Sequence, residues 1–213
     1  MKLPGTYEAS KWLLETLAAF GSKITTSKAI KPQELDRADK EMLMRNMLVE
    51  LALEDSGKKE TNGRNRSALI DEVNRKMMVP MGSPYCLTAL YFRVIDPLCD
   101  SLQLSNTVWM TASTQEFWEK SYDKYKIPKG ESAKKGDIGI LQDIKKPRLG
   151  HAYLHIEDED QGNQKTFEYN TNLKGSTEGD GNYIYKRTQE GTLTKRYLGS
   201  VDVVSWLLDT NER

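Results

Sequence analysis

The chain has 213 residues, enough for one domain with a sizeable core, or for one domain and a helical extension. Its 31 Lys and Arg residues balance 31 Asp and Glu residues, so no general basic field attracts nucleic acid or an anionic membrane, and we expect neither as a partner. Apolar residues make up 38% of the chain and charged residues 29%, a composition typical of a folded protein with a polar surface.

Three further features bear on the compartment. No stretch approaches the roughly 18 to 20 uninterrupted apolar residues of a membrane-spanning helix. Glu8 and Glu15 fall before and inside the short apolar stretch near the start, unlike a secretory signal, so we expect synthesis in the cytoplasm without a signal peptide. Cys86 and Cys99 are the only cysteines, and the intervening helix would hold them about 20 Å apart. Because a disulfide needs about 6 Å, we expect two free thiols.

Helical periodicity fills the first part of the chain. Residues 7–20 place aromatic and leucine side chains at helical spacing before Gly21, which predicts an amphipathic helix. Residues 35–55 repeat this pattern over a longer stretch and predict a second helix. We interpret residues 1–46 as a helical N-terminal extension and residues 47–213 as the main domain.

Two further helices are expected next. Ser67 can cap a helix over residues 68–77. Ser83 and Pro84 resemble another helix start, with Ser83 as the cap and Pro84 as the first helical residue. The apolar run that follows continues this helix to Pro97.

Beyond residue 100 the helical signal fades, and short apolar segments alternate with Gly-rich or charged turns. We interpret five segments as antiparallel strands: residues 137–141, 151–156, 166–170, 182–187 and 197–208. Helices followed by strands predict an α+β fold, in which N-terminal helices pack on a C-terminal antiparallel β-sheet.

Cys86 is a candidate nucleophile because of its expected place near a helix start. As the third helical residue it would lie among unpaired backbone N–H groups, where the helix dipole favours a thiolate. A thiolate attacks an amide carbonyl, and the same N–H groups could receive the oxyanion that forms. The alternative is that Cys86 is a small buried apolar residue.

The two histidines of the chain, His151 and His155, lie in one predicted strand. Ala152 and Leu154 predict that their own face points into the core, while both histidines share the opposite face. Four residues of strand separate the histidines by roughly 13 Å, so only one can reach a given thiol. We expect His155 to be an exposed surface residue. His151 is either an exposed surface residue as well or a general base.

Glu168 and Asn170 lie two residues apart in the next predicted strand and project from the same face. If this strand pairs with the strand of His151, a carboxylate or an amide can accept from the imidazole N–H and fix its tautomer. The alternative is a polar edge that faces solvent.

The order of these segments resembles a known family. The chain carries, in this order, SPYC at 83–86, GDIGIL at 136–141, GH at 150–151, FEYNTN at 167–172 and GDGNYIYKRT at 179–188. This order is similar to that of the CHAP family of cysteine- and histidine-dependent amidohydrolases/peptidases, papain-like enzymes related to the NlpC-type cell-wall hydrolases. The resemblance covers roughly residues 47–200 and rests on order and spacing, because each motif alone is common by chance.

The resemblance implies a papain-like fold and a role for each candidate. It implies Cys86 as the nucleophile and His151 as the base that later protonates the leaving amine. Glu168 and Asn170 would orient the imidazole, and we favour Glu168 as its direct partner.

The chain departs from the family around the expected cleft. Tyr85 stands where the family often has Trp, and Leu87 and Thr88 replace the usual small pair after the nucleophile. We take Tyr85 and Tyr153 as candidate substrate-binding residues, since an aromatic ring could stack on a sugar. Some relatives bind calcium through an Asp cluster ahead of the Cys, where this chain has only Asp71, so we expect no metal and no cofactor.

The sequence therefore favours a cysteine hydrolase that cleaves an amide in the peptide part of bacterial peptidoglycan through a thioester, as an amidase or an endopeptidase. It would reach the wall by phage-driven lysis, in a virion or through a dedicated secretion system. One alternative is a non-catalytic adaptor or virion structural protein with a papain-like fold. Another is a metal-dependent hydrolase using Cys86, both histidines and Glu168, which we disfavour because one strand cannot bring both histidines to one ion.

Overall fold

The structure is a computed structural model that describes residues 35–61, 63–142, 150–160, 163–172, 179–188 and 196–212. The chain divides into two compact units, Met1–Lys40 and Glu41–Arg213, and the second unit contains the sheet and the candidate site. The helix expected over residues 7–20 lies outside the described residues. No helix in the described segments is long and apolar enough to cross a membrane.

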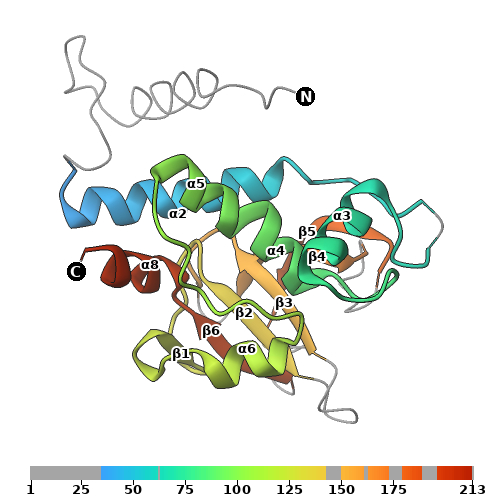
Figure 1. The fold of residues 1–213 in the computed structure, drawn as a ribbon. Helices are drawn as coiled ribbons and strands as arrows, with labels where there is room; N and C mark the ends of the chain where they lie inside the picture. Colours follow the sequence, from blue (N-terminus) through green and yellow to red (C-terminus); the bar gives the residue numbers. More distant parts are fainter. Residues whose placement is uncertain are drawn as a thin grey trace, which may run out of the picture. The chain divides into compact units, whose positions relative to one another are not determined.

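The fold is α+β, as the sequence predicts, with helices and one six-stranded antiparallel sheet (Figure 1). The helices are α2 (Arg37–Leu53), α3 (Ala68–Met77), α4 (Cys86–Leu90), α5 (Asp96–Leu102), α6 (Thr114–Lys120) and α8 (Val203–Asn211), with the π-helical turn η2 (Tyr91–Ile95) and the 3-10 turn η3 (Asp123–Tyr125). The strands are β1 (Lys126–Pro128), β2 (Ile138–Gln142), β3 (Gly150–His155), β4 (Gln164–Thr171), β5 (Gly181–Arg187) and β6 (Tyr197–Val201). In space they follow the order β1-β6-β2-β3-β4-β5.

Two helix starts show how the local sequence sets these boundaries. α3 begins where the sequence predicts, because the Ser67 hydroxyl accepts a hydrogen bond of 3.2 Å from the Ile70 N–H. The predicted start of the next helix is wrong by two residues. α4 begins at Cys86 instead of Pro84, while Ser83 lies in a turn ahead of the helix. Cys86 is therefore the first helical residue.

The helical segments α4, η2 and α5 run without a break from Cys86 to Leu102. In η2 the Asp96 N–H donates to the Tyr91 carbonyl, which is the wider spacing of a π-helical turn. Pro97 follows directly and has no N–H, so the π-helical turn carries the segment past a residue that ordinarily interrupts a helix. Both cysteines in this segment are free, as predicted.

The strand predicted over residues 197–208 is wrong in its second half. β6 ends at Val201, and α8 follows it. The reason is a cap: the Asp202 carboxylate accepts a hydrogen bond of 2.9 Å from the Ser205 N–H and so starts a helix. The sequence also gave no indication of α6, which begins where the Ser113 hydroxyl accepts from the Glu116 N–H at 3.2 Å.

Arg45 ties α2 to the sheet. Its guanidinium donates to Asp137 at 2.8 Å and to Asp202 at 3.0 Å, at the beginning of β2 and of α8. Asp137 is fully buried. Burial raises the pKa of Asp137 to about 7, helped by the charge of Asp202 and opposed by Arg45. The domain boundary expected after residue 46 falls inside α2.

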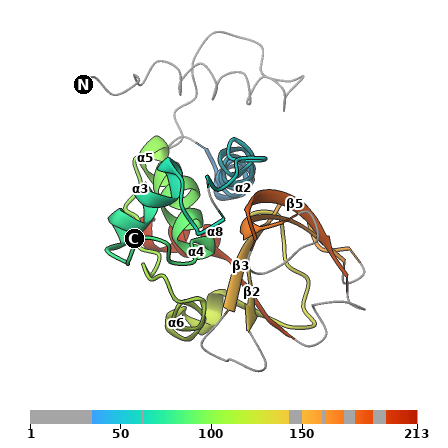
Figure 2. The same ribbon diagram turned by 90° about the vertical axis from the view of Figure 1, so that its right-hand side faces the viewer.

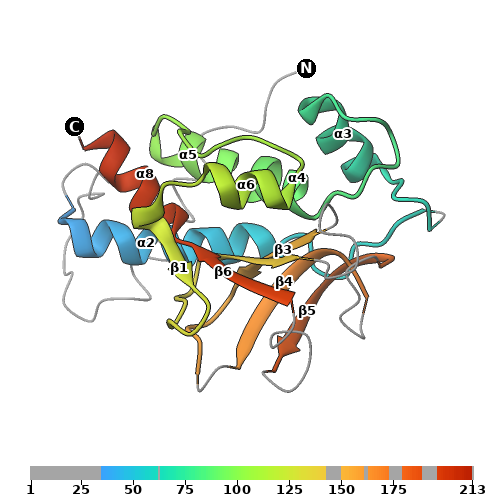
Figure 3. The ribbon, with the colours of Figure 1, turned by 90° about the horizontal axis from the view of Figure 1, so that it is seen from below.

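Helices α3, α4, α5 and α6 lie together on one side of the sheet (Figures 2 and 3). α4 contacts β3 and β4, and α6 contacts β2 and β3. The β3–β4 ladder is short, since it pairs Leu154 with Phe167 and His155 with Thr166. α4 therefore packs against β3 and β4, two strands that pair with each other over a short length.

The sheet curves, so that side chains of distant strands meet on one of its faces, called here the inner face. Tyr153 of β3 donates to Gln164 of β4 at 2.5 Å, and Tyr197 of β6 also interacts with Gln164. The Tyr153 ring covers Gly139 of β2, where an added Cβ would come within 2.2 Å of the ring. The inner face is therefore filled by its own side chains.

Candidate functional site

Cys86 is held at the first position of α4, where 4% of the residue is exposed. Burial opposes ionisation of its thiol, but interaction with His151 and with the backbone N–H groups of Ala152 and Leu87 outweighs burial and lowers the pKa. The structure therefore gives Cys86 the environment of a thiolate. This argues against a purely apolar role for the residue.

His151 lies in β3, is fully buried, and has its two ring nitrogens in different surroundings. Nε2 lies 2.9 Å from the Glu168 carboxylate, whereas Nδ1 makes no hydrogen bond to any described residue. Burial disfavours the imidazolium, yet Cys86 and Glu168 outweigh this and raise the pKa of His151 to about 9. With Nε2 engaged by Glu168, Nδ1 is the nitrogen left to exchange a proton with the Cys86 sulfur.

Glu168 is the direct partner of the imidazole, as favoured from the sequence. Its Oε1 accepts from Thr166 at 2.7 Å and from Arg187 Nε at 2.7 Å. Its Oε2 accepts from His151 and, at 2.5 Å, from Arg187 Nη2. Burial alone would raise the pKa of this carboxyl, but His151 and Arg187 lower it to about 2. Glu168 is consequently a fixed negative charge behind the imidazole.

Asn170 lies two residues beyond Glu168 in β4 and makes no hydrogen bond to His151 among the described residues. It lies in the irregular stretch of β4 between Glu168 and Thr171, with a φ of 57°. This left-handed conformation is one that Asn adopts more readily than most residues. Its backbone interacts with Tyr85, and its buried side-chain Oδ1 has no partner among the described residues. The described contacts of Asn170 therefore connect it to Tyr85 and not to the imidazole.

Tyr85 and Tyr153, the two candidates for substrate binding, are 1% and 0% exposed. The Tyr85 hydroxyl lies 3.3 Å from the Asn182 side chain, which joins the residue before Cys86 to β5. Tyr153 is part of the inner face through Gln164. Both rings therefore pack in the interior, and neither presents a face for stacking on a sugar.

The expectation that His155 is exposed is wrong. It is fully buried, and its Nε2 lies 2.8 Å from the Ser200 hydroxyl, which also contacts the Tyr197 hydroxyl at 2.7 Å. Burial lowers the pKa of His155 to about 3, so the imidazole is neutral. The alternation pattern failed because the curved sheet buries both of its faces.

Two residues of the site escaped the sequence analysis. Thr166 and Arg187 both bind Glu168, and both lie on the same face of β4 and β5 as that carboxylate. A charged residue at the end of a predicted strand gives no sign that it is buried. Tyr183, Tyr185 and Arg187 are two residues apart along one strand, so their side chains share a face. This spacing is the one sequence signal that could have placed Arg187 on the face of Glu168.

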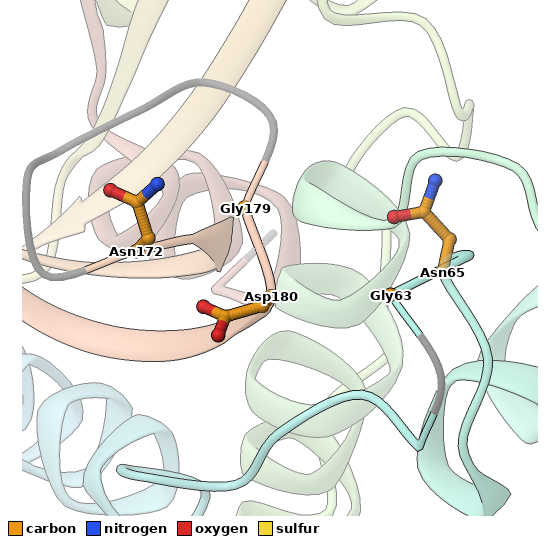
Figure 4. A pocket seen from close by; sticks show the side chains of 5 residues that line it. All are labelled: Gly63, Asn65, Asn172, Gly179 and Asp180. Atoms are coloured by element: carbon orange, nitrogen blue, oxygen red, sulfur yellow. The ribbon is translucent and has the colours of Figure 1, made fainter.

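A polar pocket of about 410 Å³ lies beside the segment that leads into α4 (Figure 4). It is lined by Gly63 and Asn65 on one side and by Asn172, Gly179 and Asp180 on the other. The Asn65 amide donates at 3.1 Å to the carbonyl of Gly82, four residues before Cys86. One lining residue of the pocket is therefore hydrogen-bonded to the loop that precedes α4.

Comparisons with protein-family models, with curated proteins and with solved structures find no match for this chain. Across the described segments, no group of three or more His, Cys, Asp or Glu residues is placed to hold a metal ion.

Proposed function

We propose that this chain is a cysteine amidohydrolase or peptidase with a papain-like fold of the NlpC/CHAP type. The observation that carries the proposal is the position of His151, which interacts with the Cys86 thiol and bonds to the Glu168 carboxylate. A nucleophile, a base and a group that orients the base are the parts that covalent amide hydrolysis needs. Their reciprocal influence on pKa favours a thiolate and an imidazolium in the resting protein.

In the proposed reaction the Cys86 thiolate attacks the carbonyl carbon of an amide, and the negative charge moves to the carbonyl oxygen. N–H groups of the first turn of α4 have no partner within the helix and can donate to this oxyanion. The C–N bond then breaks, and the imidazolium of His151 gives its proton to the leaving amine. A thioester remains on the sulfur.

Water completes the cycle. The neutral imidazole of His151 takes a proton from water, and the hydroxyl oxygen attacks the thioester carbon. The C–S bond breaks, the carboxylic acid is released, and the thiolate and imidazolium return. Glu168 stays ionised throughout and keeps the imidazole in the required tautomer and orientation.

The substrate class proposed is the peptide part of bacterial peptidoglycan, reached by phage lysis, in a virion or by dedicated secretion. The support is the order of motifs around Cys86, His151 and Glu168, which is similar to that of cell-wall hydrolases. The polar lining of the pocket beside α4, with Asn65, Asn172 and Asp180, suits a peptide rich in amides and charges.

Digestion of purified peptidoglycan sacculi tests this function, with fragments identified by mass spectrometry. Wild type should release peptides with new amine termini, and Cys86→Ala should release none. Cys99→Ala is the matched control, because Cys99 is buried with a pKa raised to about 12 by burial and should be dispensable. Failure of wild type on several wall types, or equal activity of Cys86→Ala, would contradict the proposal and favour the non-catalytic adaptor.

A further inference from the structure

Arg187, the last residue of β5, grips the carboxylate of Glu168 with two parallel hydrogen bonds. Nε donates to Oε1 at 2.7 Å and Nη2 to Oε2 at 2.5 Å. Both side chains are fully buried. Bidentate pairing of this kind fixes the plane of a carboxylate as well as its position.

The guanidinium is itself held between two aromatic rings. Its Cζ lies 5.3 Å from the centre of the Tyr153 ring and 5.4 Å from that of the Tyr185 ring. A cation over a ring face is attracted by the ring, and the attraction is strongest away from water. Tyr153 is fixed in turn by its hydrogen bond to Gln164. The Arg187 side chain thus has little freedom to move.

We propose that Arg187 is a positioning residue of the catalytic centre, whose guanidinium keeps the Glu168 carboxylate charged and correctly oriented behind the His151 imidazole. This inference rests on the function proposed above. Among the described residues the hydrogen bonds of Arg187 go to Glu168 and not to Cys86 or His151, so it would act on the reaction through Glu168.

The physical argument concerns the cost of a buried charge. A buried carboxylate without a cation would hold a proton, and a protonated Glu168 could not support the imidazolium. The other side chains around Glu168 do not replace Arg187: Thr166 offers a neutral hydroxyl, and Tyr153 and His155 are uncharged. His151 is charged only in part of the reaction, whereas Arg187 is always charged.

Alkylation of Cys86 by iodoacetamide as a function of pH tests the inference without any substrate, with the modified residue identified by peptide mapping. In Arg187→Gln, the rate–pH profile of alkylation should move up by about one pH unit or more relative to wild type, so that at any pH below the wild-type midpoint alkylation should slow roughly tenfold. The matched control is Arg93→Gln, because Arg93 grips the buried Asp55 with a similar fork, at 3.0 and 3.1 Å, outside the site. An Arg187→Gln profile equal to that of Arg93→Gln would overturn the inference.

Arg187→Lys keeps the positive charge but cannot make the two parallel hydrogen bonds to Glu168. It provides a second test if Arg187→Gln fails to fold. We expect its alkylation profile to lie near that of wild type, because the cation remains. The downfield proton resonance of the His151 Nε2–H should weaken, because Glu168 is less well fixed. An unchanged resonance together with unchanged hydrolysis would refute the positioning role.

The same experiments separate this inference from the proposed function. If the Cys86 profile depends on Arg187 while wild type cleaves no peptidoglycan, the positioning role stands and the substrate class fails. If wild type cleaves peptidoglycan and Arg187→Gln keeps both its profile and its rate, the positioning role fails and the function stands.

Discussion

Replacement of Glu168 by Gln tests the electrostatics at the centre of the site. The side chain keeps its shape, but one carboxylate oxygen becomes an NH₂ group that meets donors from His151 and Arg187. Arg187 is 1% exposed and would lose its counter-charge. In the variant the new amide NH₂ therefore faces another hydrogen-bond donor, and the buried Arg187 cation has no counter-charge.

Two routes give the size of the effect. Removal of one partner from a buried ion pair costs about 3–5 kcal/mol of unfolding free energy. The fall in the pKa of Glu168 from its ordinary 4.5 to about 2 corresponds to about 3 kcal/mol in favour of the ionised, folded form. Because the folded pKa is the lower one, this stability is present above pH 4.5 and is lost as pH falls toward 2.

Urea unfolding followed by tryptophan fluorescence measures the loss. Glu168→Gln should lose about 3 kcal/mol at pH 7 and much of the acid dependence between pH 4.5 and 2. The double variant Glu168→Gln, Arg187→Met removes the stranded cation and should recover more than about 1 kcal/mol relative to Glu168→Gln. A loss below about 1 kcal/mol, or a double variant that is less stable than the single one, would refute this account of the pair.

Three further predictions concern the frame around the site. Since the pKa of His155 is lowered to about 3, wild type should lose up to about 1.4 kcal/mol per pH unit as pH falls from 6.5 toward 3. His155→Gln should flatten that part of a stability–pH curve, and an unchanged slope would contradict the assignment. Arg45→Met strands the buried Asp137 and should cost about 3–5 kcal/mol in urea unfolding, against less than about 1 kcal/mol for Arg66→Met in an exposed pair. Ser67→Ala should lower the unfolding free energy by about 1 kcal/mol through loss of the cap, and no change would show that the cap is dispensable.

Local signals predicted much of the fold. The cap at Ser67 gave α3 its bounds, and alternation between turns located the strands β2 to β5 within two residues at each end. The apolar run over 197–208 misled because strand and helix are both compatible with a short apolar segment. Asp202 favours the helix over the strand after Val201, because its carboxylate caps α8 and also binds Arg45, a partner remote in sequence.

The sequence predicted which residues form the candidate site better than it predicted which of their neighbours are buried. The sequence selected Cys86, His151 and Glu168, which the structure brings together. It placed His155 at the surface and treated Tyr153 as a substrate contact because alternation along a strand shows which residues share a face, but not whether a sheet curves over that face. Burial of the inner face depends on contacts among four strands, which no local pattern contains.

Charge balance shows what Arg187 would add to the three groups of the proposed reaction. In the resting state of the proposed reaction the groups alternate in sign along one path: the Cys86 thiolate, the His151 imidazolium, the Glu168 carboxylate and the Arg187 guanidinium. The first three together would bury one negative charge, which is costly away from water, and Arg187 brings the sum to zero. When the imidazolium gives up its proton, Glu168 still has a cation beside it. In the proposed cycle the carboxylate can therefore stay ionised throughout, and the imidazole is the group that would move protons.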